Sequence, residues 1–200
     1  MKNLLSAGLL FASGNRHKYG EVAELFAPLG IPIIFGPDRA LLDVEEDGTT
    51  YASNAYIKAR AWAEATGLPS LADDSGVEVR ALDWRPGIFS ARMAEDDPGR
   101  VEWMLHQMRG ETDRYARYVA AFALCFPREG FSLITEGVCP GEITGEPRGR
   151  GGFGYDPVFR PLGQTGTFGE ISREIKGTIS HRALAGYAMM DILSHSSVIK

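Results

Sequence analysis

Two adjacent carboxylates, Asp73 and Asp74, follow a short apolar stretch and precede Ser75. Neighbouring carboxylates at the end of a strand repel each other unless a proton or a divalent cation holds them. Glu45 and Glu46 offer further carboxylates from another loop. Hard oxygen donors without a Cys or His cluster favour Mg²⁺, with Mn²⁺ as a substitute, over Zn²⁺. The alternative is a solvated acidic turn with local Asx-type hydrogen bonds.

The turn Ser13-Gly14-Asn15-Arg16-His17-Lys18 joins an apolar segment to the start of a helical pattern. Backbone N–H groups and the helix dipole favour an anion at such a start, and Gly14 permits close approach. The turn is not a P-loop, because it lacks that motif's glycine spacing and Lys-Ser/Thr ending. It predicts a phosphate site, and the alternative is an ordinary capped turn with solvated basic residues.

A second candidate site combines a glycine-rich loop with basic residues near the C-terminus. The loop Gly151-Gly152-Phe153-Gly154-Tyr155-Asp156-Pro157 carries two aromatic rings on which a planar base can stack. Lys176 and Ser180-His181-Arg182 place donors around the start of the last helix. The alternatives are aromatic rings that fill the core and basic residues on the surface.

The composition is that of a globular protein of 200 residues, which predicts one domain over residues 1–200. With 21 basic and 26 acidic residues, the net charge of −5 argues against a nucleic-acid partner. Two cysteines without a CxxC pair fit a reducing cytoplasm. The chain lacks an apolar run of membrane-spanning length, so we expect no membrane partner, and we take residue 1 as the mature start.

Hydrophobic periodicity and turn residues predict an α/β fold with a mixed sheet. In chain order we expect a strand at 8–12, a helix with Val22, Leu25, Phe26 and Leu29 that stops at Gly30, and a strand over Ile31–Phe35, for which Pro32 favours an edge or a first-residue position. We then expect a helix from a cap at Ser53 or Asn54 to Thr66 and a half-buried strand over 77–81, with the two carboxylates lying between strands. Next come a helix with Val101, Met104, Leu105 and Met108, a hairpin of Tyr115–Phe126 and Phe131–Gly137, and an irregular loop over Gly137–Gly154. The last helix is capped by Ser180, and its apolar residues are Leu184, Tyr187, Ala188 and Ile192.

Taken together and in order, several segments make the sequence resemble the inosine/xanthosine triphosphate pyrophosphatase family. The segments are Ser13-Gly14-Asn15 with Lys18 and Glu21, Glu46 before Gly48, Asn54-Ala55 with Lys58-Ala59, Ala72-Asp73-Asp74-Ser75-Gly76, Pro86-Gly87 with Ser90-Ala91-Arg92, Gly152-Phe153-Gly154-Tyr155-Asp156-Pro157 with Phe159, and Lys176 with Ile179-Ser180-His181-Arg182-Ala183. The resemblance covers nearly the whole chain.

This resemblance implies a fold of two lobes around a mixed central sheet, with an active-site cleft between the lobes. It implies attack of water at the α-phosphorus of ITP, dITP or XTP, which gives the monophosphate and pyrophosphate. It also implies that the protein is a homodimer, for which Met93, Trp103 or the Tyr115–Phe126 strand are candidate surfaces.

The resemblance assigns roles to individual residues. Glu46 and Asp74 hold Mg²⁺ with help from Asp73, and Asp74 is the favoured general base. Lys18, the second catalytic residue, holds phosphate together with Lys58. The expected substrate-binding residues fall into two groups. The first is Ser13, Gly14, Asn15, Arg16, His17, Lys18, Lys58 and Ser75. The second surrounds the purine and sugar and is Phe153, Gly154, Tyr155, Asp156, Lys176, His181 and Arg182.

Two alternatives stay open at this point. One is a pyrophosphatase similar to the septum-formation-inhibitor proteins, whose opening motif differs from Ser13-Gly14-Asn15. The other is a module that binds a nucleotide without cleaving it, for which fewer carboxylates suffice. Within the favoured interpretation, Lys176 and Arg182 donate hydrogen bonds to a 6-oxo group, whereas the 6-amino group of adenine would face another donor.

Overall fold

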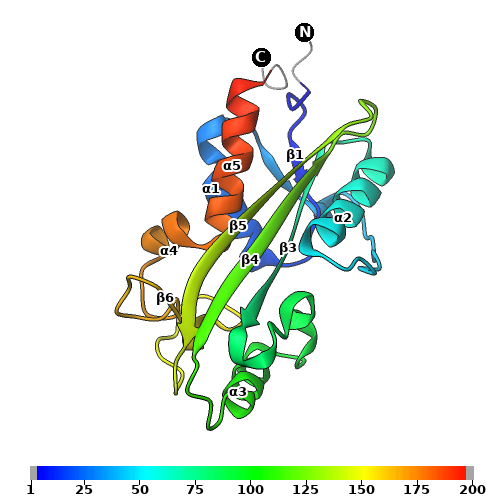
Figure 1. Ribbon diagram of the computed structural model, residues 1–200. Coiled ribbons are helices and arrows are strands. Elements are labelled where there is room, and N and C mark those ends of the chain that lie inside the picture. The colour runs from blue at the N-terminus through cyan, green and yellow to red at the C-terminus, as the bar shows by residue number, and fades with distance from the viewer. Residues whose placement is uncertain (1–3, 197–200) are drawn as a thin grey trace. The chain divides into compact units, whose positions relative to one another are not determined.

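The computed structural model describes residues 4–196 of the chain (Figure 1). The expected mature start at residue 1 therefore lies outside the described residues. The helices and strands are β1 (Leu9–Phe11), α1 (Arg16–Phe26), β2 (Ile33–Phe35), α2 (Tyr51–Thr66), β3 (Ser70–Val79), α3 (Asp97–Gln107), β4 (Tyr115–Cys125), β5 (Ser132–Ile143), β6 (Phe159–Pro161), α4 (Arg173–Ile179) and α5 (His181–His195).

The strands between residues 4 and 196 form one sheet in the order β2-β1-β3-β4-β5-β6. β1 pairs in parallel with β2 and β3, whereas β5 and β6 are antiparallel, so the predicted mixed sheet is confirmed. β2 lies at the edge, as Pro32 led us to expect. β4 and β5 are neighbours joined by a short connection, which agrees with the predicted hairpin.

The chain divides into two compact units, as expected for two lobes. The first unit contains residues 4–74, 120–137 and 184–196, and the second contains Ser75–Val119 and Val138–Ala183. The cleft implied between the lobes and the single domain over residues 1–200 stay predictions.

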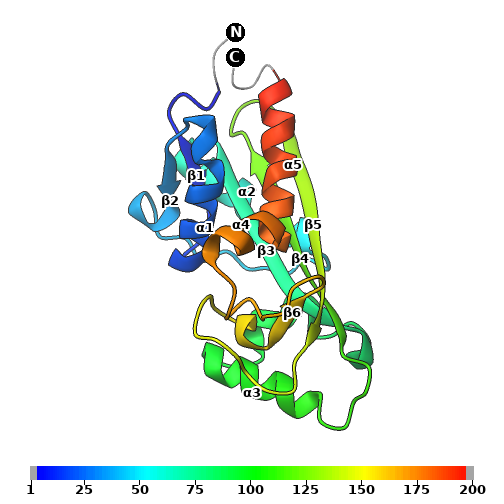
Figure 2. The same cartoon turned by 90° about the vertical axis from the view of Figure 1, so that its left-hand side faces the viewer.

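The core of the first unit is built by α1, α5 and the strands beneath them. Val22 and Phe26 of α1 are fully buried, and the Phe26 ring meets Phe122 edge to face at a centroid distance of 6.0 Å. Met189 and Leu193 of α5 join the same cluster. Figures 1 and 2 show α2 on the opposite side of these strands from α1 and α5. The predicted apolar face of α1 is therefore confirmed.

The predicted apolar face of α5 is wrong. Leu184, Tyr187 and Ile192 are exposed, and the buried positions include Ala185 and Met189. This helix is apolar around most of its circumference, so periodicity does not select a face. The close approach at Gly186 determines which face is buried, because a Cβ there would lie 2.2 Å from a Leu25 methyl carbon.

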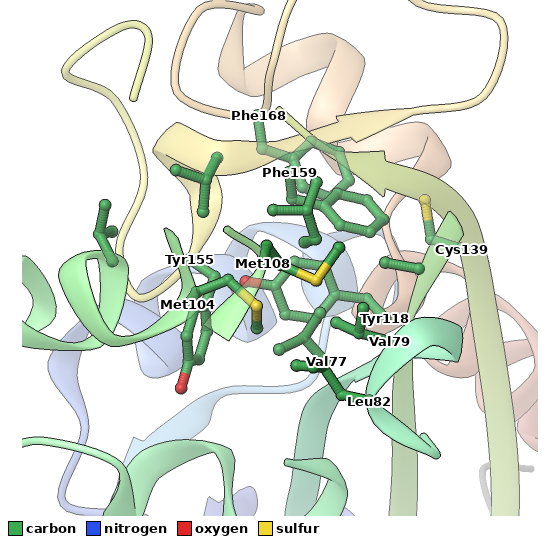
Figure 3. Close-up of a cluster of buried hydrophobic side chains, with 14 residues drawn as sticks. Val77, Val79, Leu82, Met104, Met108, Tyr118, Cys139, Tyr155, Phe159 and Phe168 are labelled. Carbon is green, nitrogen blue, oxygen red and sulfur yellow. The ribbon is translucent and has the colours of Figure 1, made fainter. Parts of the chain in front are cut away.

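The core of the second unit gathers α3 and the far parts of β3, β4 and β5 around aromatic rings (Figure 3). Met104 of α3 and Met108, which caps the end of that helix, are buried as predicted, and Val77 and Val79 of β3 lie in the same cluster. Its largest members are aromatic residues. They are Tyr118, Tyr155, Phe159 and Phe168.

The expectation that Asp73 and Asp74 lie between two strands is wrong, because β3 runs without a break from Ser70 to Val79. Gly76 allows this continuity. A Cβ at position 76 would lie 2.2 Å from the carbonyl oxygen of Gly87. The Ser90 hydroxyl also accepts a hydrogen bond of 2.9 Å from the Val77 amide. The segment around residue 90 thus covers a part of the strand that the sequence presents as a turn.

Other details of the elements also differ from the predictions. α2 is capped by Thr50 in a capping box with Ser53, not by Ser53 or Asn54. β5 continues to Ile143, so the irregular loop begins later than Gly137. A short helix, α4, precedes the last one, and the Ser180 hydroxyl between them accepts a hydrogen bond from the Ala183 amide, which confirms Ser180 as a cap. None of the helices between residues 4 and 196 is both long enough and apolar enough to cross a membrane.

We predict that Gly76→Ala lowers the free energy of unfolding by about 2 kcal/mol, because the new methyl group overlaps a backbone oxygen. Urea denaturation of both variants measures this effect. The matched control is Gly177→Ala in α4, where a Cβ has no neighbour within 4 Å. That control should be neutral or stabilising, and equal loss in both variants would contradict this account of β3.

Candidate active site

The predicted carboxylates and lysines come together in the first unit. Lys18 Nζ lies 3.1 Å from Asp73 Oδ2, whose side chain is completely buried. Lys58 Nζ lies 2.8 Å from Glu46 Oε2 and 3.9 Å from Asp74 Oδ1. The structure therefore brings together five of the predicted residues, three acidic and two basic. We call them the carboxylate cluster: Lys18, Glu46, Lys58, Asp73 and Asp74.

Local structure explains how α2 contributes two side chains to this cluster. Thr50 and Ser53 form the capping box at the start of the helix, and the buried Asn54 Nδ2 donates a hydrogen bond of 3.0 Å to Asp74 Oδ2. Lys58 follows one turn later on the same face. Gly48 lets the loop that carries Glu46 approach, because a Cβ there would lie 2.6 Å from Asn54 Oδ1. The sequence presents Asn54 as a possible helix cap and as part of a family motif, and its spacing of four from Lys58 is the signal that places both side chains on one face.

The electrostatics of Asp74 combine opposing effects. Burial raises the pKa of its carboxyl group, while the ammonium groups of Lys58 and Lys18 and the hydrogen bond from Asn54 lower it. The net pKa shift is upward. A carboxylate with a raised pKa is a stronger base, so the direction of this shift favours Asp74 as a proton acceptor.

The Ser13 to Lys18 turn has the predicted position at the start of α1. Asn15 is the helix cap, and its Oδ1 accepts hydrogen bonds from the amides of His17 at 2.9 Å and Lys18 at 3.1 Å. The Arg16 guanidinium lies 4.5 Å above the centre of the Phe35 ring. A phosphate on this turn has to share the His17 and Lys18 amides with Asn15, and the contact itself stays a prediction.

The predicted base-binding residues of the second unit also come together around a buried ion pair. Lys176 Nζ lies 2.6 Å from Asp156 Oδ2, and the same oxygen accepts a hydrogen bond of 2.8 Å from the Phe153 amide. The Lys176 ammonium lies 4.8 Å from the centre of the Phe153 ring. Gly152 is required here, since its φ is +74° and a Cβ would lie 1.9 Å from Asp156 Oδ2. We call Phe153, Asp156, Lys176, His181 and Arg182 the donor cluster.

His181 and Arg182 complete the donor cluster, and both are buried. Arg182 donates a hydrogen bond of 3.0 Å to the Ser75 hydroxyl, and its guanidinium carbon lies 5.6 Å from the centre of the Phe153 ring. The His181 imidazole stacks on the ring of Tyr118. Tyr118 escaped the sequence analysis because it lies within a strand of apolar residues, where nothing distinguishes it from core.

Tyr155 has a different place from Phe153. Its side chain is buried in the core of the second unit, and its hydroxyl donates a hydrogen bond of 2.8 Å to the Ser90 carbonyl oxygen. This corresponds to the alternative in which an aromatic ring of the loop fills the core. Any contact of Tyr155 with a substrate is thus left to the backbone of the turn.

A groove of about 890 Å³ lies between α3 and the glycine-rich loop of the second unit. Phe153 and Gly154 contribute to its wall, but Lys176, His181 and Arg182 do not. The side chains with the chemistry for nucleotide recognition are therefore in the donor cluster and not in this groove.

Comparison with known proteins gives consistent matches over most of the chain. Residues 9–192 match the model of the Ham1 family. A dITP/XTP pyrophosphatase of Synechococcus sp. (strain CC9311) is 44% identical over 88% of this chain and 85% of its own. One of Streptomyces coelicolor is 41% identical over 92% of this chain and 96% of its own. The structure of a HAM1 protein from Coxiella burnetii superposes with a TM-score of 0.86 at 38% identity, over 94% of this chain and 99% of that one.

We predict that Asp74→Asn stabilises the protein at pH 7 to 8 in the presence of EDTA by about 1 kcal/mol. A carboxyl group whose pKa is raised in the folded state costs stability once it ionises, and the cost vanishes below its unfolded pKa. The advantage of the variant should therefore disappear as the pH falls. Thermal unfolding over a pH series measures it.

The matched control for that series is Asp113→Asn. A hydrogen bond from Arg80 lowers the pKa of Asp113, so its ionised form favours the folded state. This variant should lose stability at neutral pH, and the loss should shrink in acid. The same sign for both variants would contradict the opposite pKa shifts.

Proposed function

Because this chain belongs to the Ham1 family, we propose that it hydrolyses the non-standard purine nucleotides ITP, dITP and XTP to monophosphate and pyrophosphate. The observation that carries the proposal is the carboxylate cluster, in which Lys18 and Lys58 contact Asp73, Asp74 and Glu46. Nucleotide binding alone does not need three carboxylates beside the phosphate-binding lysines. We place the activity in the cytoplasm, where the nucleotide pool is found.

In the proposed reaction, residues of the chain position the triphosphate and activate the attacking water. Asp74 accepts a proton from the attacking water. Asn54 Nδ2 holds Asp74 Oδ2, which leaves Asp74 Oδ1 on the side of Lys58. Lys18 and Lys58 bind the phosphates, and their charges oppose the negative charge that develops on the phosphate oxygens. Water and the triphosphate thus give a monophosphate, pyrophosphate and a proton.

The donor set of the carboxylate cluster fits Mg²⁺, with Mn²⁺ as a substitute. Among residues 4–196 no group of three or more His, Cys, Asp and Glu side chains is arranged as a complete metal site. Mg²⁺ commonly takes one or two carboxylates and completes its shell with water and substrate phosphates. We assign Glu46 and Asp74 as its ligands, with Asp73 nearby. When bound, Mg²⁺ neutralises phosphate charge and lowers the pKa of water.

The donor cluster suits a 6-oxopurine. Lys176 and Arg182 carry donors only, so an oxo group satisfies them and an adenine amino group does not. Their burial makes an unpaired contact costly. Phe153 offers a ring on which the purine can stack.

The experiment that tests this function measures products from separate nucleotides with Mg²⁺. ITP, dITP and XTP should release pyrophosphate, and ATP should release little. Asp74→Asn should lower kcat by about 10² to 10⁴, because the general base is lost while the shape of the side chain is kept. Orthophosphate as the product, or full activity of Asp74→Asn, would contradict the proposal, and tight ITP binding without any product would favour a binding module.

We also propose a homodimer, formed through an apolar groove of the second unit. This groove has a volume of about 180 Å³ and includes Met93 and Trp103, two residues singled out from the sequence. At its rim the Phe89 side chain is 49% exposed. Exposed aromatic residues beside an apolar groove are typical of the centre of a protein interface.

Phe89→Glu should weaken the dimer by at least about thirtyfold, because a charge would have to be buried in the interface. Light scattering coupled to gel filtration measures the change. Phe131→Glu is the matched control, since Phe131 is similarly exposed but lies in the first unit. A dimer that survives Phe89→Glu would contradict the proposed surface.

A further inference from the structure

Tyr118 contacts the donor cluster from within the core of the second unit. Its ring lies 4.4 Å from the His181 imidazole between centroids, and the two planes are only 6° apart. The Tyr118 ring also packs against two phenylalanine rings. The distance between ring centroids is 4.7 Å to Phe159 and 6.1 Å to Phe168. Figure 3 shows Tyr118 among these aromatic side chains. We call Tyr118, Phe159 and Phe168 the aromatic wall.

The same wall supports a second member of the donor cluster. The Lys176 ammonium lies 5.5 Å from the centre of the Phe168 ring. Phe168 in turn stacks on Phe159 at 5.3 Å, with an angle of 27° between the rings. Two donors that come from different helices, α4 and α5, therefore contact one continuous set of rings.

We propose that Tyr118 is a positioning residue for base recognition, because its ring fixes the plane of the His181 imidazole against which the purine edge is read. The proposal rests on the function proposed above and assigns a residue to its selectivity.

Parallel stacking is the reason that Tyr118 sets an orientation and does not merely fill space. The imidazole ring turns about its χ2 torsion, whose preference is broad. An aliphatic neighbour leaves that rotation open, whereas a ring parallel to the imidazole favours one plane. Rotation would carry the two ring nitrogens away from a purine edge. Fixing the plane in advance also lowers the entropy that is lost on binding.

The test separates recognition of the base from binding of the phosphates. Tyr118→Leu removes the stacking ring, and Tyr118→Phe keeps it. For ITP and XTP we expect KM to rise about three- to tenfold in Tyr118→Leu, the size of an aromatic pair interaction, and to stay near the wild-type value in Tyr118→Phe. The inhibition constant of inorganic triphosphate, which has no base, should not change in either variant.

A matched control excludes a general loss of packing. Met104→Ala also removes a fully buried side chain from the same cluster, on α3. It should lower the melting temperature without raising KM. Tyr118→Met, whose flexible side chain fills the space without a ring, serves as a second variant and should behave like Tyr118→Leu.

The outcomes are distinct. An unchanged KM in Tyr118→Leu and Tyr118→Met would overturn the positioning role while the wild-type activity stands. So would an equal rise for ITP and for inorganic triphosphate, or the same rise in Met104→Ala. Absence of ITP hydrolysis by the wild-type protein would instead overturn the proposed function, and the role of Tyr118 with it.

Discussion

Asp73 and Asp74 are neighbouring carboxylates buried within a continuous strand, and such a pair is costly unless positive charge and hydrogen bonds compensate it. The first unit supplies that compensation from two helices. The start of α1 delivers Lys18 to Asp73, and α2 delivers Asn54 and Lys58 to Asp74. The capping box of α2 and the close approach at Gly48 serve the same arrangement. The elements of this unit therefore place positive charge and hydrogen bonds around two buried carboxylates, which are the groups that the proposed reaction uses.

In the second unit the buried charge that needs compensation is positive. Its buried ammonium, Lys176, is compensated by Asp156, which also binds the Phe153 amide and so fixes the glycine-rich loop. Buried donors such as Arg182 discriminate between substrates because an unmatched partner is expensive away from water. In the proposed function, charge for the phosphates comes from the first unit and selectivity for the base from the second. The cysteines take no part, since burial raises the pKa of Cys125 to about 11 and of Cys139 to about 12.

Sequence patterns were sufficient where local chemistry decides the structure. The amphipathic faces of α1 and α3 and the edge position of β2 follow from periodicity and from Pro32. The family resemblance was confirmed, and the structure brings the named side chains of Lys18, Lys58 and the carboxylates together, while their roles stay predictions. Sequence patterns failed where contacts between residues far apart in the sequence determine the structure. Gly76 is typical of a turn in the sequence, but in the structure the Gly87 backbone packs against it within a strand. The buried face of α5 depends on the contact at Gly186. Tyr118 has the sequence context of an ordinary strand residue, and only the structure shows that His181 stacks on it.

The proposed mechanism requires that water attacks the α-phosphorus, and the position of an oxygen label shows which phosphorus is attacked. ITP is hydrolysed by the wild-type protein in water enriched in oxygen-18, and the two products are examined by mass spectrometry. Attack at the α-phosphorus places the label in IMP and leaves pyrophosphate unlabelled. Label in pyrophosphate would show attack at the β-phosphorus and would contradict the account.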